Sequence, residues 1–338
     1  MEIEIRTRTP LWTGGVDGTM DRIHETGIIG SLRWWYEAIV RGLGGWACDP
    51  SKHECPDKDG KFCDVCRVFG ATGWRRRFRL EVVDDTKAIW DDENRMLNIR
   101  PPDRTRGWFL PPGRMGRLTL RLDGDERVLS LLAALLLFLE RWGSVGAKPQ
   151  LGYGVFAVEN RDQVRQRASQ WRWNVMGDRK PSQTLPDLRR FGFFRYRFRP
   201  ERPGWWTQVP GIRRVATRVQ PLVTRYRTVP VSPALKNAWR FHEWRRRWGD
   251  DRRIFGSLRP ERRRGRVAVS WAYSVEKREW EVRGWGWLPA EQEAGQHLWR
   301  LLINDRVWAE VLGMAGRIHT LQAASVSDVQ HVLEEVKE

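Results

Sequence analysis

The stretch ETGIIGSLRWWYEAIVRGLGG, residues 25–45, decides the fold, because it combines a periodic helix with glycines at both ends. Its apolar side chains recur at three- and four-residue spacing and form one stripe: Ile28, Leu32, Trp35, Tyr36, Ile39, Val40 and Leu43. Arg33, Glu37 and Arg41 follow one another at four-residue spacing on the opposite side. We therefore expect a helix with one buried face and one solvent-exposed face.

The start of this helix favours an anion. Ser31 is a suitable N-cap, and the glycine pair at 44–45 is a suitable C-terminal stop. Gly27 and Gly30 then precede the first turn, where they allow another chain to approach the backbone closely. Because unpaired N–H groups make this end partly positive, an arginine at Arg33 in the first turn indicates a bound phosphate. The alternative is a core helix whose arginines are solvated.

The chain carries far more positive than negative charge. Its 338 residues include 60 Lys and Arg against 42 Asp and Glu, which gives a net charge of +18 and a sequence pI near 10.6. Such an excess predicts a polyanionic partner, and arginine favours phosphate and bases because its guanidinium is planar and weakly hydrated. A thermophile's ion-pair surface, the alternative, would carry more balanced charge. We expect a nucleic acid.

The length and the apolar content of 41% allow two domains with real cores. No apolar run reaches the roughly 18 residues of a membrane helix. The N-terminal MEIEIRTRTPLW also lacks the apolar segment of a signal peptide. We expect a cytoplasmic protein that does not contact a membrane.

Tryptophan is abundant and often lies beside arginine. Among the 21 tryptophans are those of Trp74-Arg75, Arg172-Trp173, Trp239-Arg240 and Trp244-Arg245. Aromatic rings and guanidinium groups can both stack on unpaired bases. Most of the tryptophans are nevertheless expected to pack in the core, with a minority at a ligand.

All four cysteines lie in the loop-rich segment 45–68: Cys48, Cys55, Cys63 and Cys66. Disulfides are unusual in the cytoplasm, so this clustering favours a metal. The CxxC spacing of Cys63 and Cys66 suits tetrahedral zinc, and Cys48 and Cys55 can supply the other two ligands. Since the gap in this other pair is wide, His53 could replace either residue. Buried free thiols are the alternative. A zinc ion with four protein ligands would be structural.

The element order of the first half is that of an α+β fold. We expect a strand over 1–8, the helix of 25–45, strands over 78–83 and 117–122, a helix over 126–142 and a strand over 155–158. This order is the ferredoxin-like βαββαβ plan, with the cysteine-rich insertion after the first helix. Residues 84–107 are polar and are expected to form an exposed arm.

The second half is expected to contain strands over 191–199, 267–273 and 280–287, and helices over 234–248 and 291–302. We expect an N-terminal domain over 1–160 with its insertion at about 45–68, a linker over 161–190 and a C-terminal domain over 191–338. Five arginines in the turn 255–266 precede a strand.

Two further segments resemble phosphate-binding loops. The triple arginine Arg75 to Arg77 follows FGATGW and can contact several phosphates, although such a run is often only a solvated strand entry. The glycine-rich segment 143–154, GSVGAKPQLGYG, can lie flat on a sugar-phosphate backbone. This segment is not a Walker loop, so nucleotide hydrolysis is not supported.

Several motifs together resemble the RAMP superfamily of CRISPR-associated proteins. They are LWTGG, ETGIIGSLRWWYEAIVRGLGG, CDVCRVFGATGWRRRF, GAKPQLGYGVF, IFGSLRP and WGWLP. They are more narrowly similar to the first-numbered RAMP subunit of the Cmr complex, the type III-B RNA-guided effector. The resemblance covers most of the chain and is weakest over 84–112 and 161–186.

This resemblance implies two ferredoxin-like (RRM-like) halves and a place in an antiviral ribonucleoprotein. The partners it implies are CRISPR guide RNA, target RNA and other Cmr-type effector subunits, with the chain holding the 3′ part of the guide. The expected RNA-binding residues are Arg22, His24, Arg33, Trp34, Arg41, Arg75, Arg76, Arg77, Lys148, Gln150, Tyr153 and Arg259.

We expect no catalytic residue. The alternative is a RAMP-type endoribonuclease that cleaves guide precursor or target RNA. Its candidate residues are Asp17, Asp21 and His24 in the loop after the first strand, where His24 could reach a 2′-hydroxyl as general base.

Overall fold

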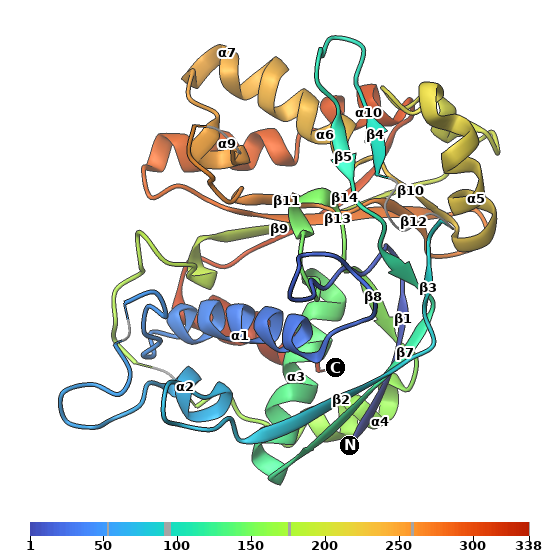
Figure 1. The fold of residues 1–338 in the computed structure, drawn as a ribbon. Helices are drawn as coiled ribbons and strands as arrows, with labels where there is room; N and C mark the ends of the chain where they lie inside the picture. Colours follow the sequence, from blue (N-terminus) through green and yellow to red (C-terminus); the bar gives the residue numbers. More distant parts are fainter. Residues whose placement is uncertain (53, 91–95, 175–176, 258–259, 338) are drawn as a thin grey trace.

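The computed structural model describes residues 1–338 apart from 53, 91–95, 175–176, 258–259 and 338. The chain forms two main antiparallel sheets. Helices α1 and α3 lie below the second sheet in Figure 1, and further helices cover its upper side. The predicted mixture of α and β structure is confirmed.

Within the described ranges, no helix is long and apolar enough to cross a membrane.

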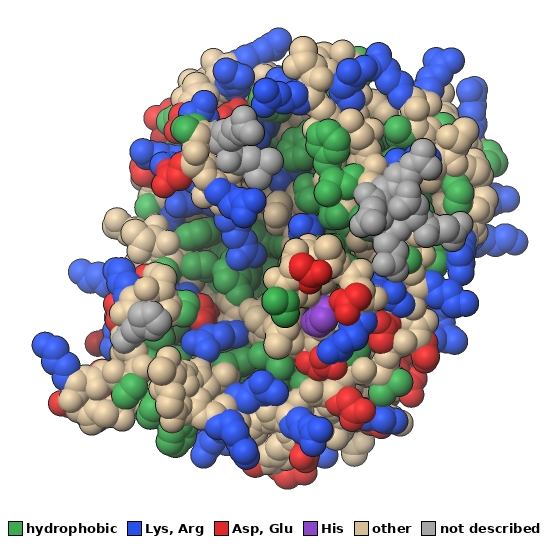
Figure 2. Space-filling view, in the orientation of Figure 1, with side chains coloured by type: hydrophobic (Ala, Val, Ile, Leu, Met, Phe, Trp, Pro, Cys, Tyr) green, Lys and Arg blue, Asp and Glu red, His purple; other side chains and the backbone are tan. Residues whose placement is uncertain are grey.

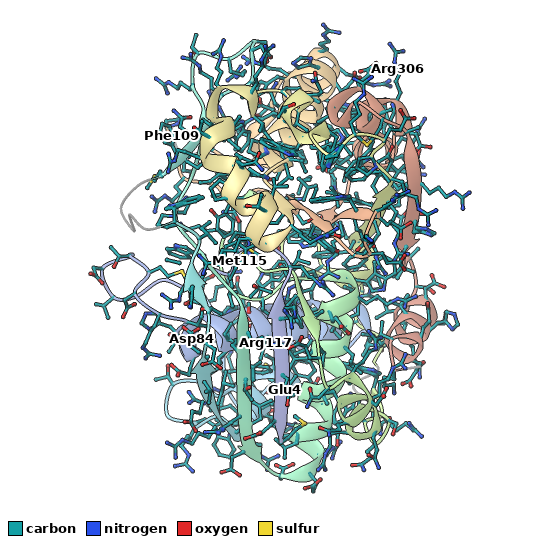
Figure 3. All side chains as sticks on the ribbon, turned by 90° about the vertical axis from the view of Figure 1, so that its right-hand side faces the viewer. Glu4, Asp84, Phe109, Met115, Arg117 and Arg306 are labelled. Atoms are coloured by element: carbon teal, nitrogen blue, oxygen red, sulfur yellow. The ribbon has the colours of Figure 1, made fainter. Side chains whose placement is uncertain are left out.

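The first sheet has the strand order β2-β7-β1-β8 and is antiparallel throughout. Its strands are β1 (Glu2–Thr7), β2 (Phe78–Asp84), β7 (Arg117–Gly124) and β8 (Phe156–Val158). Because side chains alternate along a strand, Ile3 lies on the buried face opposite Leu120. Glu4 and Arg117 lie on the outer face (Figure 3).

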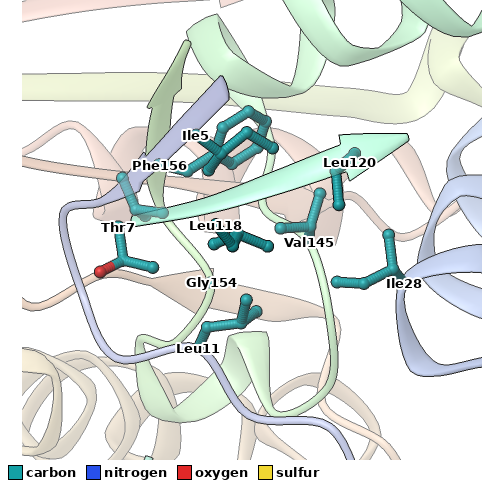
Figure 4. Close-up of a pocket in the computed structure, with 10 residues that line it drawn as sticks. Ile5, Thr7, Leu11, Ile28, Leu118, Leu120, Val145, Gly154 and Phe156 are labelled. Atoms are coloured by element: carbon teal, nitrogen blue, oxygen red, sulfur yellow. The ribbon is translucent and has the colours of Figure 1, made fainter. Parts of the chain in front are cut away.

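Helices α1 (Glu25–Gly42) and α3 (Glu126–Trp142) cover the buried face of this sheet, and the apolar stripe predicted for α1 is buried as expected. Ile5, Leu118 and Ile28 are among the side chains that close on an apolar crevice between sheet and helix (Figure 4). The crevice leaves essentially no room for water, so this half is tightly packed.

Helix α1 begins at Glu25, earlier than predicted. Ser31 is not its N-cap; the Ser31 hydroxyl donates to the Ile28 carbonyl and accepts from the Gly146 N–H at 2.9 Å. Gly27 lies inside the first turn, and a Cβ there would be 2.7 Å from the side chain of Thr13. The close approach expected at this glycine therefore comes from the preceding loop of the same chain.

The second sheet has the order β10-β12-β13-β9-β14, with β11 also paired to β13. Its strands are β9 (Phe191–Phe198), β10 (Thr228–Val229), β11 (Val267–Val269), β12 (Ala272–Ser274), β13 (Trp280–Trp287) and β14 (Gly316–Gln322). Phe193 on one face contacts Trp35 of α1, with ring centroids 6.2 Å apart. Phe194 on the other face contacts Trp308 at 5.7 Å. The sheet thus separates the two main cores.

The remaining helices follow the sequence in order. They are α2 (Asp64–Phe69), α4 (Arg161–Ala168), α5 (Ala216–Tyr226), α6 (Ser232–Asn237), the π-helix η5 (Ala238–Trp244), α7 (Arg245–Trp248), α8 (Arg252–Phe255), α9 (Gln292–Leu302), α10 (Asp305–Leu312) and α11 (Val326–Glu335). The 3₁₀ turns are η1 (Pro149–Leu151), η2 (Leu188–Arg190), η3 (Trp205–Gln208) and η4 (Arg213–Val215). The C-terminal α11 returns to the first half, where Val329 and Leu333 join its core.

Residues 84–107 were expected to form an exposed arm, but their described part belongs to a longer strap that joins the halves. The strap contains β3 (Lys87–Ala88) and β4 (Leu97–Ile99) and continues through β5 (Trp108–Leu110) and β6 (Arg114–Met115). Leu97, Ile99 and Leu110 are buried in the core of the second half. Figure 3 shows the crossing: Asp84 lies in the lower half and Phe109 beside the upper half, with Met115 between them. The prediction was wrong because few but well-spaced apolar residues are enough to bury such a hairpin.

A buried charged network lies on the face of the second sheet that points to the first half. Glu281 accepts hydrogen bonds from Arg195 and Arg197, each at 2.8 Å, and from the Tyr273 hydroxyl. Burial alone would raise the pKa of Glu281, but the Arg195 guanidinium lowers it to about 2. Arg283 donates to backbone carbonyls at the C-terminal end of α3, so the network fastens the sheet to that helix.

The glycine-rich segment 143–154 is also a joint between the halves. Gly152 has a φ of +92°, and a Cβ there would lie 2.5 Å from Cδ1 of Trp271. Lys236 of α6 is 1% exposed, and its Nζ donates to the Gln150 carbonyl at 2.8 Å. These glycines therefore serve close packing inside the protein.

The buried Lys236 predicts a pH dependence of stability. Burial lowers the pKa of Lys236 to about 7, whereas an unfolded lysine keeps its proton up to a pH of about 10.4. Between these values the unfolded chain binds more protons, so stability rises with pH. Lys236→Met removes this contribution, and we expect urea unfolding at several pH values to show a flatter slope of unfolding free energy above pH 7. Lys277→Met, at an exposed position, is the control. An equal slope in the Lys236 variant and the wild type would contradict the prediction.

Candidate nucleic-acid interface

Four of the predicted arginines line one open cleft, which we call the arginine groove. Its volume is about 940 Å³, and it is lined by Arg33, Phe69, Gly70, Ala71, Trp74, Arg75, Arg76, Arg77, Phe78, Arg79, Asp123 and Gly124. Arg75, Arg76 and Arg77 are exposed to solvent, and Trp74 is 42% exposed. The groove therefore offers several guanidinium groups and an aromatic ring to one ligand.

A tight turn presents these arginines. Helix α2 ends at Phe69 and is followed by Gly70, whose φ is +86° and whose Cβ, if present, would lie 2.8 Å from the Trp74 carbonyl oxygen. Ala71 and Trp74 exchange backbone hydrogen bonds of 3.0 and 2.9 Å, and the Arg77 N–H donates to the Val68 carbonyl. Only glycine fits easily at Gly70, so the sequence Phe-Gly-Ala-Thr-Gly-Trp determines where the arginines emerge.

Arg33 forms the opposite wall of the groove from the middle of α1, and the prediction that it lies in the first turn is wrong. Its Nη1 donates to the Gly70 carbonyl at 2.8 Å and its Nε to Glu37 at 3.0 Å. Its Nη2 lies 3.3 Å from Sγ of Cys66. Burial disfavours its charge, but the hydrogen bond with Glu37 contributes to a net rise in the pKa of Arg33.

A second cleft, which we call the tryptophan cleft, lies between α1 and the second sheet. It holds about 440 Å³ and is lined by Trp34, Thr184, Pro186, Arg253, Arg263, Arg264, Gly265, Arg266, Trp285 and Trp287. The Arg264 guanidinium lies 4.8 Å from the Trp34 ring, and that of Arg266 lies 4.3 Å from the Trp287 ring. Figure 2 shows a hollow in this region, with hydrophobic side chains at its floor and Lys or Arg around it.

Adjacent residues of α1 open onto the two clefts: Arg33 lines the arginine groove and Trp34 the tryptophan cleft. Helix α1 is therefore a wall that both share. Guanidinium groups bind phosphate oxygens, and indole and guanidinium planes stack on unpaired bases. The pair of clefts has the chemistry to hold a single-stranded nucleic acid.

Two of the predicted RNA contacts are buried by the fold. Arg41 is 6% exposed and donates to the carbonyls of Cys48 and Pro186 at 2.8 and 3.1 Å. Tyr153 is 1% exposed and donates its hydroxyl proton to the Pro111 carbonyl at 2.5 Å. Intramolecular contacts account for both side chains, so we leave them out of the interface.

The other predicted residues lie outside the two clefts. Lys148 is half-buried, with Nζ 3.8 Å from the Trp12 ring centroid, and Gln150 accepts the hydrogen bond of Lys236 through its carbonyl. Arg22 is paired with Glu25 at 3.0 Å. His24 Nε2 lies 2.6 Å from Asp21, and this hydrogen bond lowers the pKa of the Asp21 carboxyl. Arg259 lies outside the described residues.

The residues that the sequence interpretation missed are those of the second half in the tryptophan cleft. They are Arg253, Arg263, Arg264, Arg266, Trp285 and Trp287. The arginine-rich turn 255–266 could have indicated the four arginines of this set that lie in or near it. The alternation Trp285-Gly286-Trp287 could have indicated the two tryptophans, because it directs both rings to one face of β13.

The side chains of the four cysteines lie close together, as predicted. The sulfur atoms of Cys48, Cys55, Cys63 and Cys66 all lie within 4.8 Å of one another, and those of Cys48 and Cys66 are 3.6 Å apart. Metal–sulfur bonds of about 2.3 Å in a tetrahedron place sulfur atoms roughly 3.8 Å apart, so the donor set fits a metal of this kind. His53, the alternative ligand, lies outside the described residues.

Backbone and side-chain donors favour the thiolate form of one of these cysteines, Cys63, whereas burial contributes to a raised pKa of the Cys48 and Cys66 thiols. The Cys66 N–H donates to Sγ of Cys63, and the Cys63 N–H donates to Sγ of Cys55, each at 3.4 Å. The hydrogen bond with the Cys66 side chain is the main cause that lowers the pKa of the Cys63 thiol to about 4. A thiolate is the form of cysteine that binds metals.

Comparison with solved structures finds distant likenesses along the whole chain. The crystal structure of Cmr1 from Pyrococcus furiosus (apo form) is 16% identical, with a TM-score of 0.46 over 96% of this chain and 98% of that chain. A type III-B Cmr-beta complex bound to cognate target RNA and AMPPnP in the presence of ssDNA contains a chain that is 12% identical, with a TM-score of 0.42 over 99% of this chain and 98% of that one.

A further Cmr-beta structure bound to cognate target RNA matches at 11% identity and a TM-score of 0.40, over 99% of this chain and 98% of that chain. No curated protein matches the sequence. Residues 4–157, which contain most of the first sheet, α1 and the cysteine cluster, match the RAMP superfamily.

Proposed function

We propose that the chain is an RNA-binding subunit of a type III-B CRISPR effector complex, where it helps to hold the 3′ region of the guide RNA and the target RNA. The observation that carries this proposal is the arginine groove, in which Arg33 and Arg75 to Arg77 face one open cleft beside Trp74. The match of residues 4–157 to the RAMP superfamily supports RNA as the polyanion. The motif resemblance to the Cmr family supplies the neighbouring subunits as partners.

In this proposal the two clefts divide the work of binding. The exposed arginines of the groove dock phosphates and set the position of the strand without reading its sequence. Trp34 and Arg264 in the tryptophan cleft receive an unstacked base or ribose. Holding RNA in this way needs no catalytic group, so the proposed subunit is non-catalytic.

We propose ferredoxin-like topology for the first half, supported by the element order β1, α1, β2, β7, α3, β8 and the four-stranded antiparallel sheet. The proposal extends to the second half by the motif resemblance. We also propose the division into domains over 1–160 and 191–338, which the two separate sheets support, with the strap and α11 each crossing between the halves.

The triple variant Arg75→Gln, Arg76→Gln, Arg77→Gln should weaken RNA binding without regard to sequence. Each lost phosphate contact removes about 0.7 from the slope of log affinity against log salt for a single strand, so the slope should fall by up to roughly 2. Fluorescence anisotropy with labelled single-stranded RNA at several salt concentrations measures both quantities.

The matched control removes three charges from exposed positions of the second half: Arg278→Gln, Arg300→Gln and Arg306→Gln. This control should bind RNA nearly as the wild type does. If the groove variant kept the wild-type affinity and salt slope, or if both variants lost binding equally, the groove would not be the RNA site.

We also propose that the cysteine cluster holds a structural zinc, because four thiols of suitable spacing leave no ligand position for substrate. Freshly purified protein should then contain about one zinc per chain by elemental analysis. Cys63→Ser should lose the metal and unfold at a lower temperature, since metal binding is coupled to folding. Protein without zinc or another metal, with a melting temperature unaffected by chelator, would refute this proposal.

The second candidate is an endoribonuclease, and the 2.6 Å contact between His24 Nε2 and Asp21 is the observation that favours it. A carboxylate that orients an imidazole is a common arrangement for a general base. If this candidate is right, guide precursor or target RNA should be cleaved with or without Mg²⁺, and His24→Gln and Asp21→Asn should abolish cleavage. His319→Gln, in the exposed strand β14, is the control. Intact RNA in all samples supports the non-catalytic proposal.

A further inference from the structure

We propose that Arg33 couples the four-cysteine centre to the arginine groove, so that metal loading sets the shape of the groove and its affinity for RNA. The inference rests on the proposed function for the identity of the polyanion. Its structural part, the link between Arg33 and the cysteines, stands on the geometry alone.

One guanidinium group touches both sites. Nη2 of Arg33 lies 3.3 Å from Sγ of Cys66, while Nη1 donates to the carbonyl of Gly70 in the turn that forms the groove. Nε is fixed by Glu37 at 3.0 Å. With its three nitrogens engaged on different partners, Arg33 has one preferred position as long as Cys66 accepts its hydrogen bond.

The charge of a loaded centre favours this arrangement. Four thiolates around a divalent ion carry a formal charge of about −2, which a partly buried site must compensate. Arg33 reaches a ligand sulfur directly, and Arg41 reaches the backbone carbonyl of Cys48 at 2.8 Å. A hydrogen bond from a guanidinium to a negatively charged acceptor is charge-assisted, so Arg33 is well placed to compensate the charge of a loaded centre.

The groove is attached to the cysteines along the chain as well. Cys66 lies within the six-residue helix α2, and Gly70 directly follows that helix. The Arg77 N–H donates to the Val68 carbonyl, so the segment that carries the groove arginines is hydrogen-bonded to α2. A helix this short is not stable without outside contacts. Loss of the metal would therefore loosen both walls of the groove.

A preorganised groove binds more tightly because less conformational entropy is lost on binding. We accordingly expect metal-free protein to bind single-stranded RNA about tenfold more weakly than metal-loaded protein. Since coupling between two ligands is reciprocal, saturating RNA should raise the metal affinity by the same factor. The coupling should disappear when Arg33 is replaced.

The first experiment measures the metal alone. Zinc-loaded full-length protein is titrated with a chromogenic chelator, and Arg33→Gln is compared with Arg75→Gln. Both variants lose one groove charge, but only Arg33 touches a cysteine sulfur. Changes to groups around metal ligands typically cost 10- to 100-fold in metal affinity, so Arg33→Gln should release zinc that much more readily while Arg75→Gln behaves as the wild type.

The second experiment adds labelled single-stranded RNA to the same titration. RNA should slow zinc release from the wild type. The effect should be smaller for Arg33→Lys, because lysine keeps the charge but cannot bridge three partners. Arg33→Gln should show no effect of RNA. Circular dichroism of each zinc-loaded variant checks that it is folded. If Arg33→Gln is not folded, Arg33→Lys is compared with the wild type in its place.

The outcomes separate the inference from the function on which it rests. Equal zinc affinity in Arg33→Gln, Arg75→Gln and the wild type would overturn the coupling, whatever RNA does. Unchanged zinc release in saturating RNA that demonstrably binds the wild type would also overturn it. If the wild type binds no RNA, the proposed function fails, and the zinc titration still decides whether Arg33 supports the cysteine centre.

Discussion

The row Arg33, Glu37 and Arg41 on α1 is the interaction on which the candidate sites depend. Glu37 and Arg41 are each 6% exposed, and burial raises the pKa of Glu37 despite its two arginine neighbours. Ion pairs removed from water are costly unless further hydrogen bonds satisfy them. Here those bonds come from the carbonyls of Gly70, Cys48 and Pro186, so the charged row fastens the cysteine insertion and the segment before β9 to the helix.

This row also shows what could and could not be predicted from the sequence. Apolar periodicity correctly predicted the buried stripe of α1, and alternation predicted β1 and β7, because these patterns reflect local geometry. The spacing of Arg33, Glu37 and Arg41 predicted a solvent-exposed face, and this was wrong. The periodicity of one helix says nothing about an insertion later in the chain that folds back over it.

The same limit applies to the tryptophans. Neighbours in sequence need not face the same side of the chain, and Arg172 is exposed while Trp173 is 1% exposed. The pairs that could hold a base are instead distant in sequence, as with Trp34 and Arg264. The abundance of both residue types predicted a site that combines arginine and tryptophan, but only the packing of α1 against the second sheet determines which residues line the tryptophan cleft.

The glycines show why arginine-rich grooves need residues that never touch the ligand. The glycines near the predicted loops were expected to leave backbone bare for phosphate, yet Gly152 packs on Trp271 and Gly70 holds a turn that a side chain would obstruct. What glycine supplies in both places is a sharp change of chain direction. At Gly70 that change turns the chain from α2 into the exposed run Arg75 to Arg77, and its carbonyl anchors Arg33 across the groove. Charge and shape in the groove thus come from different residues, and the cysteine centre lies directly behind both.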